Sequence, residues 1–192
     1  MVAHMVNPLT DGIWLPRARR ELSPNRDARP QVGAGGLVEL VVIHNISLPP
    51  GRFGTRLVNE FFCNRLDCSQ DETLADLAGV EVSAHLFIDR RGVATQFVPF
   101  DERAWHAGVS SWRGRCSCND FAIGIELEGT DDKAYTKSQY RRLAASLSWL
   151  FRVYPQLSVD RIVGHNEIAP GRKTDPGAAF DWARLFESLR TS

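Results

Sequence analysis

Hydrophobic positions along the chain form short strand-like runs that alternate with helical stripes. A nearly continuous run of β-branched residues and leucine extends over 38–44 and predicts a strand that is buried on both faces. Apolar residues at helical spacing predict a helix over 55–66. Two further runs, 83–89 and 93–98, flank Arg90-Arg91-Gly92 and predict two antiparallel strands joined by a turn.

The second half of the chain continues this alternation. Residues 122–128 predict a strand whose aliphatic residues point to one face, while Gly124, Glu126 and Glu128 point to the other. The clearest helical stripe extends over 137–154, where apolar residues recur at three- and four-residue steps.

The ends of these elements carry further signals. Thr136 and Gln139 fit a capping box at the start of the long helix. Weaker patterns predict a short strand over 161–165 and a closing amphipathic helix over 181–189.

Two segments lack a periodic pattern. Residues 67–80 are acidic and weakly patterned, which predicts a loop. Residues 1–37 are rich in Pro, Arg and Gly, and we expect a loop-rich extension that packs on a domain formed by residues 38–192. Because no internal repeat separates the remaining elements, the sequence predicts one α/β (α+β) domain with a central mixed β-sheet flanked by helices.

Composition narrows the function classes. The chain has 192 residues, 43% of them hydrophobic, and its 23 basic and 23 acidic residues cancel to zero net charge. This balance argues against nucleic acid and against a membrane surface as partners. No apolar run reaches the length of a signal peptide or a transmembrane helix, so we expect a cytoplasmic protein. We also expect the protein to be a monomer.

The four cysteines do not form a known metal-binding pattern. Cys63 and Cys68 are separated by four residues, and Cys116 and Cys118 by one, unlike the paired two-residue gaps of a zinc ribbon. These spacings favour free thiols. A Cys63–Cys68 bridge and a weak structural metal site remain alternatives.

Two histidines stand where predicted strands end, at an edge at which open α/β sheets place their sites. His44 follows the first buried strand and His165 follows the strand over 161–165, although each alone is more often a structural residue. Lys173 and Asp175 lie in a loop punctuated by Pro and Gly, for which a solvated turn is an equal interpretation. Two imidazoles and a carboxylate can bind Zn²⁺ and leave a position for water, as amide hydrolysis requires.

Such chemistry also needs a carboxylate that takes up a proton and a cation beside the oxyanion. Glu126 and Glu128 share one strand face at about 7 Å by strand rise, and spacing does not choose between them.

Longer stretches resemble the AmpD type of zinc N-acetylmuramoyl-L-alanine amidases, within the wider amidase and peptidoglycan-recognition-protein fold. The matching stretches are Val42-Ile43-His44-Asn45, Arg103-Ala104-Trp105-His106-Ala107-Gly108, Ile123-Gly124-Ile125-Glu126-Leu127-Glu128-Gly129 and Arg172-Lys173-Thr174-Asp175-Pro176-Gly177. Residues 67–74 depart from the family, which usually has a His-Pro-Tyr-Phe segment between Arg65 and Ser83.

The resemblance implies a role for particular residues. The positions that match the zinc ligands are His44, His165 and Asp175. Glu126 matches the proton acceptor and Lys173 the residue that stabilises the transition state. Three positions match residues near the substrate groove, although packing explains them equally well: Asn45, Trp105 and His106. His85 is expected to be structural.

The implied reaction is hydrolysis of the amide between the lactyl group of a muramic acid and the L-Ala of its stem peptide. The resemblance further implies a preference for 1,6-anhydro sugars, a place in cytoplasmic muropeptide recycling, and an indirect lowering of β-lactamase induction. One alternative is a metal-free muropeptide-binding module, which the presence of all three matched ligands disfavours. Another is a zinc peptidase with an unrelated substrate, which the matching stretch at 105–108 disfavours.

Overall fold

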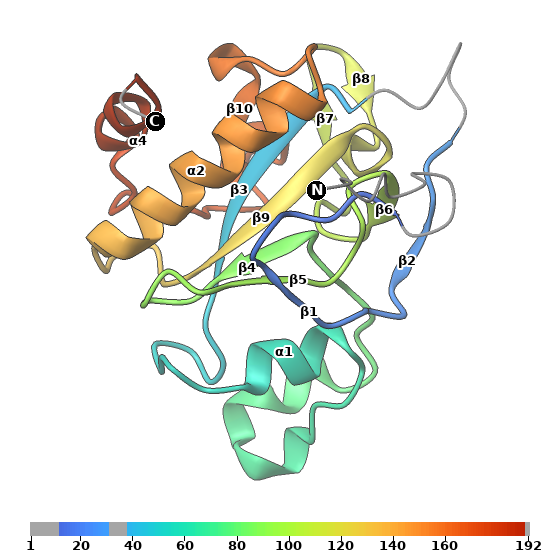
Figure 1. Ribbon diagram of the computed structural model, residues 1–192. Coiled ribbons are helices and arrows are strands. Elements are labelled where there is room, and N and C mark those ends of the chain that lie inside the picture. Colours follow the sequence, from blue (N-terminus) through green and yellow to red (C-terminus); the bar gives the residue numbers. More distant parts are fainter. Residues whose placement is uncertain (1–11, 31–37, 191–192) are drawn as a thin grey trace, which may run out of the picture.

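The computed structural model describes residues 12–30 and 38–190, and its centre is a six-stranded sheet (Figure 1). In spatial order the strands are β1 (Arg19–Arg20), β5 (Ala94–Gln96), β4 (Leu86–Ile88), β9 (Ala122–Glu128), β3 (Leu40–Ile46) and β10 (Ile162–Gly164). Strands β4, β9, β3 and β10 are parallel, whereas β5 is antiparallel to β4 and parallel to β1. The predicted mixed sheet is therefore confirmed.

Four short strands form two small antiparallel ladders beside this sheet. Strand β2 (Arg26–Ala28) pairs with β6 (Glu102–Ala104), and β7 (Ser111–Trp112) pairs with β8 (Arg115–Cys116). The helices are α1 (Leu57–Phe62), α2 (Lys137–Val153), α3 (His165–Ile168) and α4 (Trp182–Arg190), with short 3₁₀ turns η1 (Cys68–Gln70), η2 (Glu72–Leu77), η3 (Cys118–Asp120) and η4 (Val159–Arg161). Among the described residues, no helix has the length and apolar character needed to cross a membrane.

The long helix α2 begins where its sequence signal predicts. The Thr136 backbone N–H donates to the Gln139 side chain at 3.0 Å, and the Gln139 N–H donates to the Thr136 hydroxyl at 3.1 Å. These two bonds satisfy donors that a helix start would otherwise leave unpaired. The capping box is therefore confirmed.

Two layers cover the faces of the sheet. Helix α2 crosses in front of β3 and β9, and α4 packs beside it (Figure 1). The apolar stripe of α2, including Leu143 and Leu147, forms the main core with Ile123, Ile125 and Leu127 of β9. The opposite face of the sheet is therefore left to carry the polar residues of β9.

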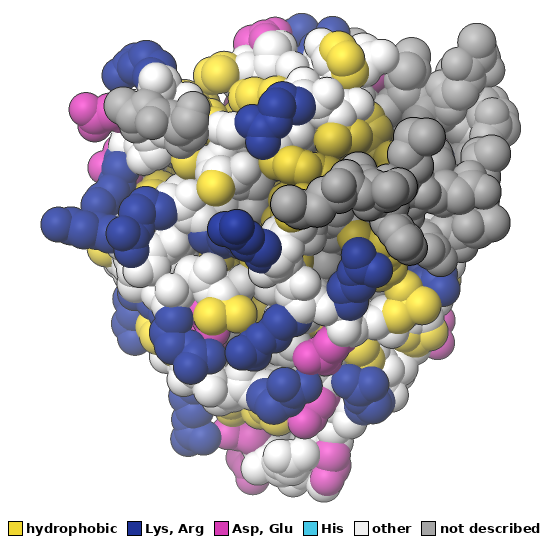
Figure 2. Space-filling model, in the orientation of Figure 1, with side chains coloured by type: hydrophobic (Ala, Val, Ile, Leu, Met, Phe, Trp, Pro, Cys, Tyr) yellow, Lys and Arg dark blue, Asp and Glu magenta, His cyan; other side chains and the backbone are white. Residues whose placement is uncertain are grey.

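A second apolar cluster closes part of that opposite face. Phe61 and Phe62 of α1 pack with Phe87 of β4 and with Phe97. Figure 2 shows the α2 side of the molecule, where lysine and arginine side chains are scattered and no described histidine reaches the surface.

Local predictions differ from the structure in several places. Helix α1 covers Leu57–Phe62 and is shorter at both ends than the predicted 55–66. The segment 67–80 is not a plain loop, because Asp67 and Asp71 cap the short turns η1 and η2 with their side chains. Strand β3 continues past the predicted end at His44 to Ile46, where it still pairs with β9. Strand β10 ends at Gly164, so that His165 is the first residue of helix α3.

The described part of the N-terminal segment, residues 12–30, contributes β1 to the sheet and β2 to the ladder with β6. The rest of the predicted extension, 1–11 and 31–37, lies outside the described residues. The four cysteine residues carry free thiols.

Candidate active site and metal centre

A cavity of about 330 Å³ lies beside the end of β10 and the last residues of β3. The eight residues that the family resemblance marked as site positions all line it: His44, Asn45, Trp105, His106, Glu126, His165, Lys173 and Asp175. Apolar side chains from α1 and from the segment 77–82 complete its wall. The structure thus brings together residues that lie as far apart in the chain as 44 and 175.

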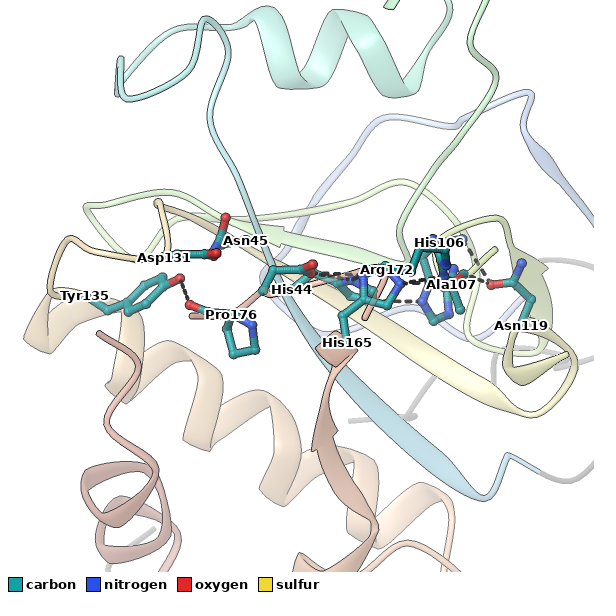
Figure 3. A network of polar contacts seen from close by, with 11 residues as sticks. His44, Asn45, His106, Ala107, Asn119, Asp131, Tyr135, His165, Arg172 and Pro176 are labelled. Carbon is teal, nitrogen blue, oxygen red and sulfur yellow. Dashed lines mark hydrogen bonds and ion pairs between the residues drawn. The ribbon is translucent and has the colours of Figure 1, made fainter. Parts of the chain in front are cut away.

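The side chains of His44, His165 and Asp175 converge at one point. Figure 3 shows the two histidines side by side. Nδ1 of His44 lies 3.0 Å from Nδ1 of His165 and 3.1 Å from Oδ2 of Asp175. Nδ1 of His165 lies 3.0 Å from the same carboxylate oxygen. Both imidazoles are buried, and the Asp175 side chain is 15% exposed, so the cluster opens to the cavity on the carboxylate side.

Sheet register explains the approach of the two histidines. Strands β3 and β10 are parallel neighbours, with Ile43 opposite Gly164. His44 and His165 each come one residue later, so they reach the same edge of the sheet although 121 residues separate them. Sequence spacing could not show this register.

The loop that carries Asp175 is anchored at both ends. The Asn166 N–H donates to the Asp175 carbonyl at 3.0 Å. Gly177 has a positive φ of 79°, and a Cβ there would lie 2.1 Å from Cα of Asp131, so only glycine allows the two segments to approach so closely. Tyr135 donates its hydroxyl to the Pro176 carbonyl at 2.8 Å. These contacts hold the carboxylate toward the histidines.

A hydrogen-bond partner assigns the tautomer of His165. Its Nε2 lies 3.2 Å from the carbonyl of Ala107, an acceptor, so this nitrogen carries the hydrogen and Nδ1 bears a lone pair. Nε2 of His44 lies 2.9 Å from Nδ1 of His106, and either ring can donate in this contact. Nδ1 of His165, Nδ1 of His44 and a carboxylate oxygen of Asp175 thus lie about 3 Å from one another, an arrangement that a cation would stabilise.

The environment of His44 favours its neutral form. Burial lowers the pKa of His44 from 6.5 to about 4, so the imidazole is neutral near pH 7 and able to act as a ligand. The donor set of two buried imidazoles and one carboxylate fits Zn²⁺.

Glu126 lies next to this cluster, paired in register with His44 across β9 and β3. Its Oε2 atom is shielded from solvent and has no hydrogen-bond partner among the described residues. Burial, and then the charge of Asp175, raise the pKa of the Glu126 carboxyl well above its usual value, while Lys173 opposes them. A carboxyl group in this environment is suited to take up and release a proton.

Glu128 has a different environment. It is 2% exposed and its carboxylate accepts hydrogen bonds from the backbone N–H groups of Gly54 and Arg90. It does not line the cavity that holds Glu126. The two carboxylates that strand spacing left equivalent therefore differ in position: Glu126 lines the cavity, and Glu128 joins two loops.

Lys173 and Asn45 lie on the rim. Lys173 is exposed and lines both this cavity and a polar groove of about 600 Å³ that adjoins it. The amide of Asn45 donates to Asp131 at 2.7 Å, so Asn45 helps to hold the loop of Asp131 as well as lining the groove.

His106 lies under the cluster in a space that glycine provides. A Cβ on Gly124 would lie 2.4 Å from Cγ of the His106 ring. Nδ1 of His106 contacts His44, and its Nε2 is buried without a partner among the described residues. Trp105 lines the same cavity.

His85 is fully buried and accepts a hydrogen bond from the Gly124 N–H at 3.0 Å. It lies outside the lining of the cavity, in agreement with the structural role expected from the sequence.

Sequence reasoning missed two residues that shape the site. Arg172 donates to the carbonyls of Ala107 and Val109, and Asn119 accepts from the N–H groups of His106 and Ala107. Arg172 stands inside one of the quoted stretches of the resemblance, but no periodic or spacing signal separates either residue from ordinary loop residues.

Comparison with known proteins identifies the family and the fold. The family model for N-acetylmuramoyl-L-alanine amidase matches residues 34–178. The crystal structure of an Se-Met AmpD derivative superposes with a TM-score of 0.87 at 50% identity, over 92% of this chain and 96% of that one. The mixed sheet and its flanking helices are thus those of the amidase fold.

The chain belongs to the N-acetylmuramoyl-L-alanine amidase family and, within it, to the AmpD type. It is 52% identical to the 1,6-anhydro-N-acetylmuramyl-L-alanine amidase AmpD of Escherichia coli K12, over 90% of this chain and 92% of that protein. It is 51% identical to the AmpD of Citrobacter freundii, over 95% of each chain. It is therefore an N-acetylmuramoyl-L-alanine amidase.

A more distant relative has been solved with a bound substrate. The amidase AmiD of E. coli, in complex with anhydro-N-acetylmuramic acid-L-Ala-D-gamma-Glu-L-Lys, superposes with a TM-score of 0.59 at 28% identity. The match covers 83% of this chain and 61% of that one.

Proposed function

We propose that this amidase hydrolyses the amide between the lactyl group of 1,6-anhydro-N-acetylmuramic acid and the L-Ala of its stem peptide, with Zn²⁺ bound by His44, His165 and Asp175. The curated relatives near 50% identity are 1,6-anhydro-N-acetylmuramyl-L-alanine amidases, which supports this choice of substrate. The observation that carries the proposal is the convergence of two buried imidazoles and a carboxylate at one wall of the cavity.

Bound Zn²⁺ polarises a carbonyl and lowers the pKa of a bound water toward about 7. Around it, Glu126 accepts the proton of the attacking water and passes it to the leaving amine of L-Ala, because its shielded carboxyl is unpaired and faces the cavity. Lys173 supplies a positive charge beside the oxygen that becomes negative when water adds to the carbonyl.

The remaining rim residues orient the substrate. Trp105 offers an apolar face next to the apolar wall formed by α1, whereas Asn45 and the polar groove beside it offer hydrogen bonds. We propose that these two sides bind different parts of the muropeptide.

The test is mass spectrometry of an anhydromuramoyl-tripeptide incubated with the protein, with and without a chelator. We expect free tripeptide only when metal is present. An anhydromuramoyl-tripeptide that stays intact with zinc-loaded protein, or that is cleaved equally in excess chelator, contradicts the proposal.

The proposal extends to the cell. We propose that the enzyme acts as a monomer in cytoplasmic muropeptide recycling and that it lowers the pool of muropeptides that induce β-lactamase. A strain without the gene should accumulate anhydromuropeptides that still carry peptide, and complementation with the wild-type gene should remove them.

A further inference from the structure

The turn at residues 106–109 lies against His165 and is held from two sides (Figure 3). On one side, Oδ1 of Asn119 accepts from the N–H of His106 at 3.1 Å and from the N–H of Ala107 at 2.8 Å. On the other, Nη2 of Arg172 donates to the carbonyls of Ala107 and Val109 at 2.6 and 2.7 Å. The backbone of Ala107 is thus fixed through both its N–H and its carbonyl.

Gly108 makes the second of these contacts possible. Its φ of 56° lies in the left-handed region, which turns the chain so that the carbonyls before and after it reach the same guanidinium nitrogen. Both bonds have a charged donor, and such hydrogen bonds are about twice as strong as neutral ones.

The Ala107 carbonyl is also the acceptor for His165. Its oxygen accepts hydrogen bonds from Nε2 of His165 at 3.2 Å and from Nη2 of Arg172 at 2.6 Å, which uses both of its lone pairs. The two donors lie 3.5 Å apart and aim at one oxygen, so Arg172 does not compete with His165 but fixes the group to which His165 donates.

We propose that Arg172 is a positioning residue for the metal centre. By holding the Ala107 carbonyl, it keeps the hydrogen of His165 on Nε2 and the lone pair on Nδ1, which faces His44 and Asp175. Groups that receive the second nitrogen of a metal-binding histidine typically change metal affinity by about 10–100-fold when they are removed. This inference rests on the proposed function only in assuming that the site binds Zn²⁺.

The experiment measures Zn²⁺ affinity by competition with a chromophoric chelator, in the wild type and in Arg172→Ala, Arg172→Lys and Arg141→Ala. Arg141 is an exposed arginine on α2, whose guanidinium contacts Ser138, and serves as the matched control. We expect about 10–100-fold weaker binding in Arg172→Ala, an intermediate loss in Arg172→Lys, and no change in Arg141→Ala.

A second readout reports the imidazole itself. Long-range ¹H–¹⁵N spectra of the metal-free proteins should show His165 protonated on Nε2 in the wild type and a mixture of tautomers in Arg172→Lys. This comparison stands even if Arg172→Ala does not fold.

The outcomes separate the two proposals. The role of Arg172 is overturned if its variants keep wild-type Zn²⁺ affinity and an unchanged His165 tautomer. It is also overturned by a raised KM with unchanged Zn²⁺ affinity, because Arg172 would then be a substrate contact in the polar groove that it lines. A wild-type protein that binds no Zn²⁺ instead overturns the proposed function.

Discussion

Single substitutions distinguish the role of Glu126 from the role of its neighbour Glu128. Glu126→Ala should retain bound metal but lower kcat by about 10²–10⁴-fold, because it removes the group proposed to transfer the proton. Glu128→Ala should instead lower the unfolding midpoint, since the N–H groups of Gly54 and Arg90 lose their acceptor. If Glu128→Ala loses turnover while Glu126→Ala keeps it, the assignment is reversed.

The environment of Glu126 also predicts a pH dependence of stability in the metal-free protein. Burial raises its folded-state pKa well above 4.5, so the folded state binds the proton more tightly than the unfolded state does. Stability from this group is complete below about pH 4.5 and falls as the pH rises. Glu126→Gln does not titrate, so its unfolding free energy relative to the wild type should increase from pH 5 to pH 8. Urea titrations in the presence of a chelator measure this, and a constant difference would contradict it.

Asp175 is the only carboxylate among the three side chains that converge. Asp175→Ala should therefore lose Zn²⁺ and activity together. The measurement is zinc content by elemental analysis after dialysis, with Asp160→Ala as control because Asp160 is exposed and pairs with Arg113. Retention of one zinc per chain in Asp175→Ala would show that the carboxylate is not a ligand.

At the scale of elements, β9 lies close to the His106 ring because Gly124 has no side chain. Gly124→Ala places a methyl group against the His106 ring and should destabilise the fold by about 1–3 kcal/mol. The double variant Gly124→Ala/His106→Ala should recover part of this loss, because the ring is gone. Additive effects of the two substitutions in urea unfolding would argue against the contact.

Long elements were predictable from local pattern, and short ones were not. The bounds of β9 match the prediction, and those of α2 agree to within one residue, because each buries a full periodic face against the main core. Strand β1 has two residues and exists only through its pairing with the distant strand β5, and the two-residue strands β7 and β8 pair with each other in a short hairpin. Two residues are too few to leave a periodic signal in the sequence. The turns η1 and η2 depend on single aspartate caps within an acidic stretch.

The site could be predicted in its residue types but not in its geometry. Polar residues at strand ends pointed to the two histidines, the loop after His165 offered Lys173 and Asp175 as candidates, and the family resemblance gave these residues their roles. The choice between Glu126 and Glu128 depends on which loops pack above β9, and the role of Arg172 depends on the turn at Gly108. Both are tertiary contacts.

For the whole molecule, the three converging residues come from β3, from α3 and from the loop before α4, and their extremes are 131 residues apart. Zn²⁺ that binds only the folded state should therefore stabilise the entire domain. At a free concentration 100 times Kd the gain is about 2.7 kcal/mol. Thermal unfolding should show a midpoint that rises with Zn²⁺ concentration, and Asp175→Ala should abolish that rise. An unchanged wild-type midpoint would falsify the shared site.

The two outer strands of the sheet offer little surface for edge-to-edge pairing between copies of the chain. Strand β1 offers only Arg19 and Arg20, both exposed, and β10 at the opposite margin has three residues. An incoming strand would find few free backbone groups on either margin, and two positive charges on one of them. The short outer strands therefore disfavour edge-to-edge aggregation, while the interior strands β3 and β9, with seven residues each, carry His44 and Glu126.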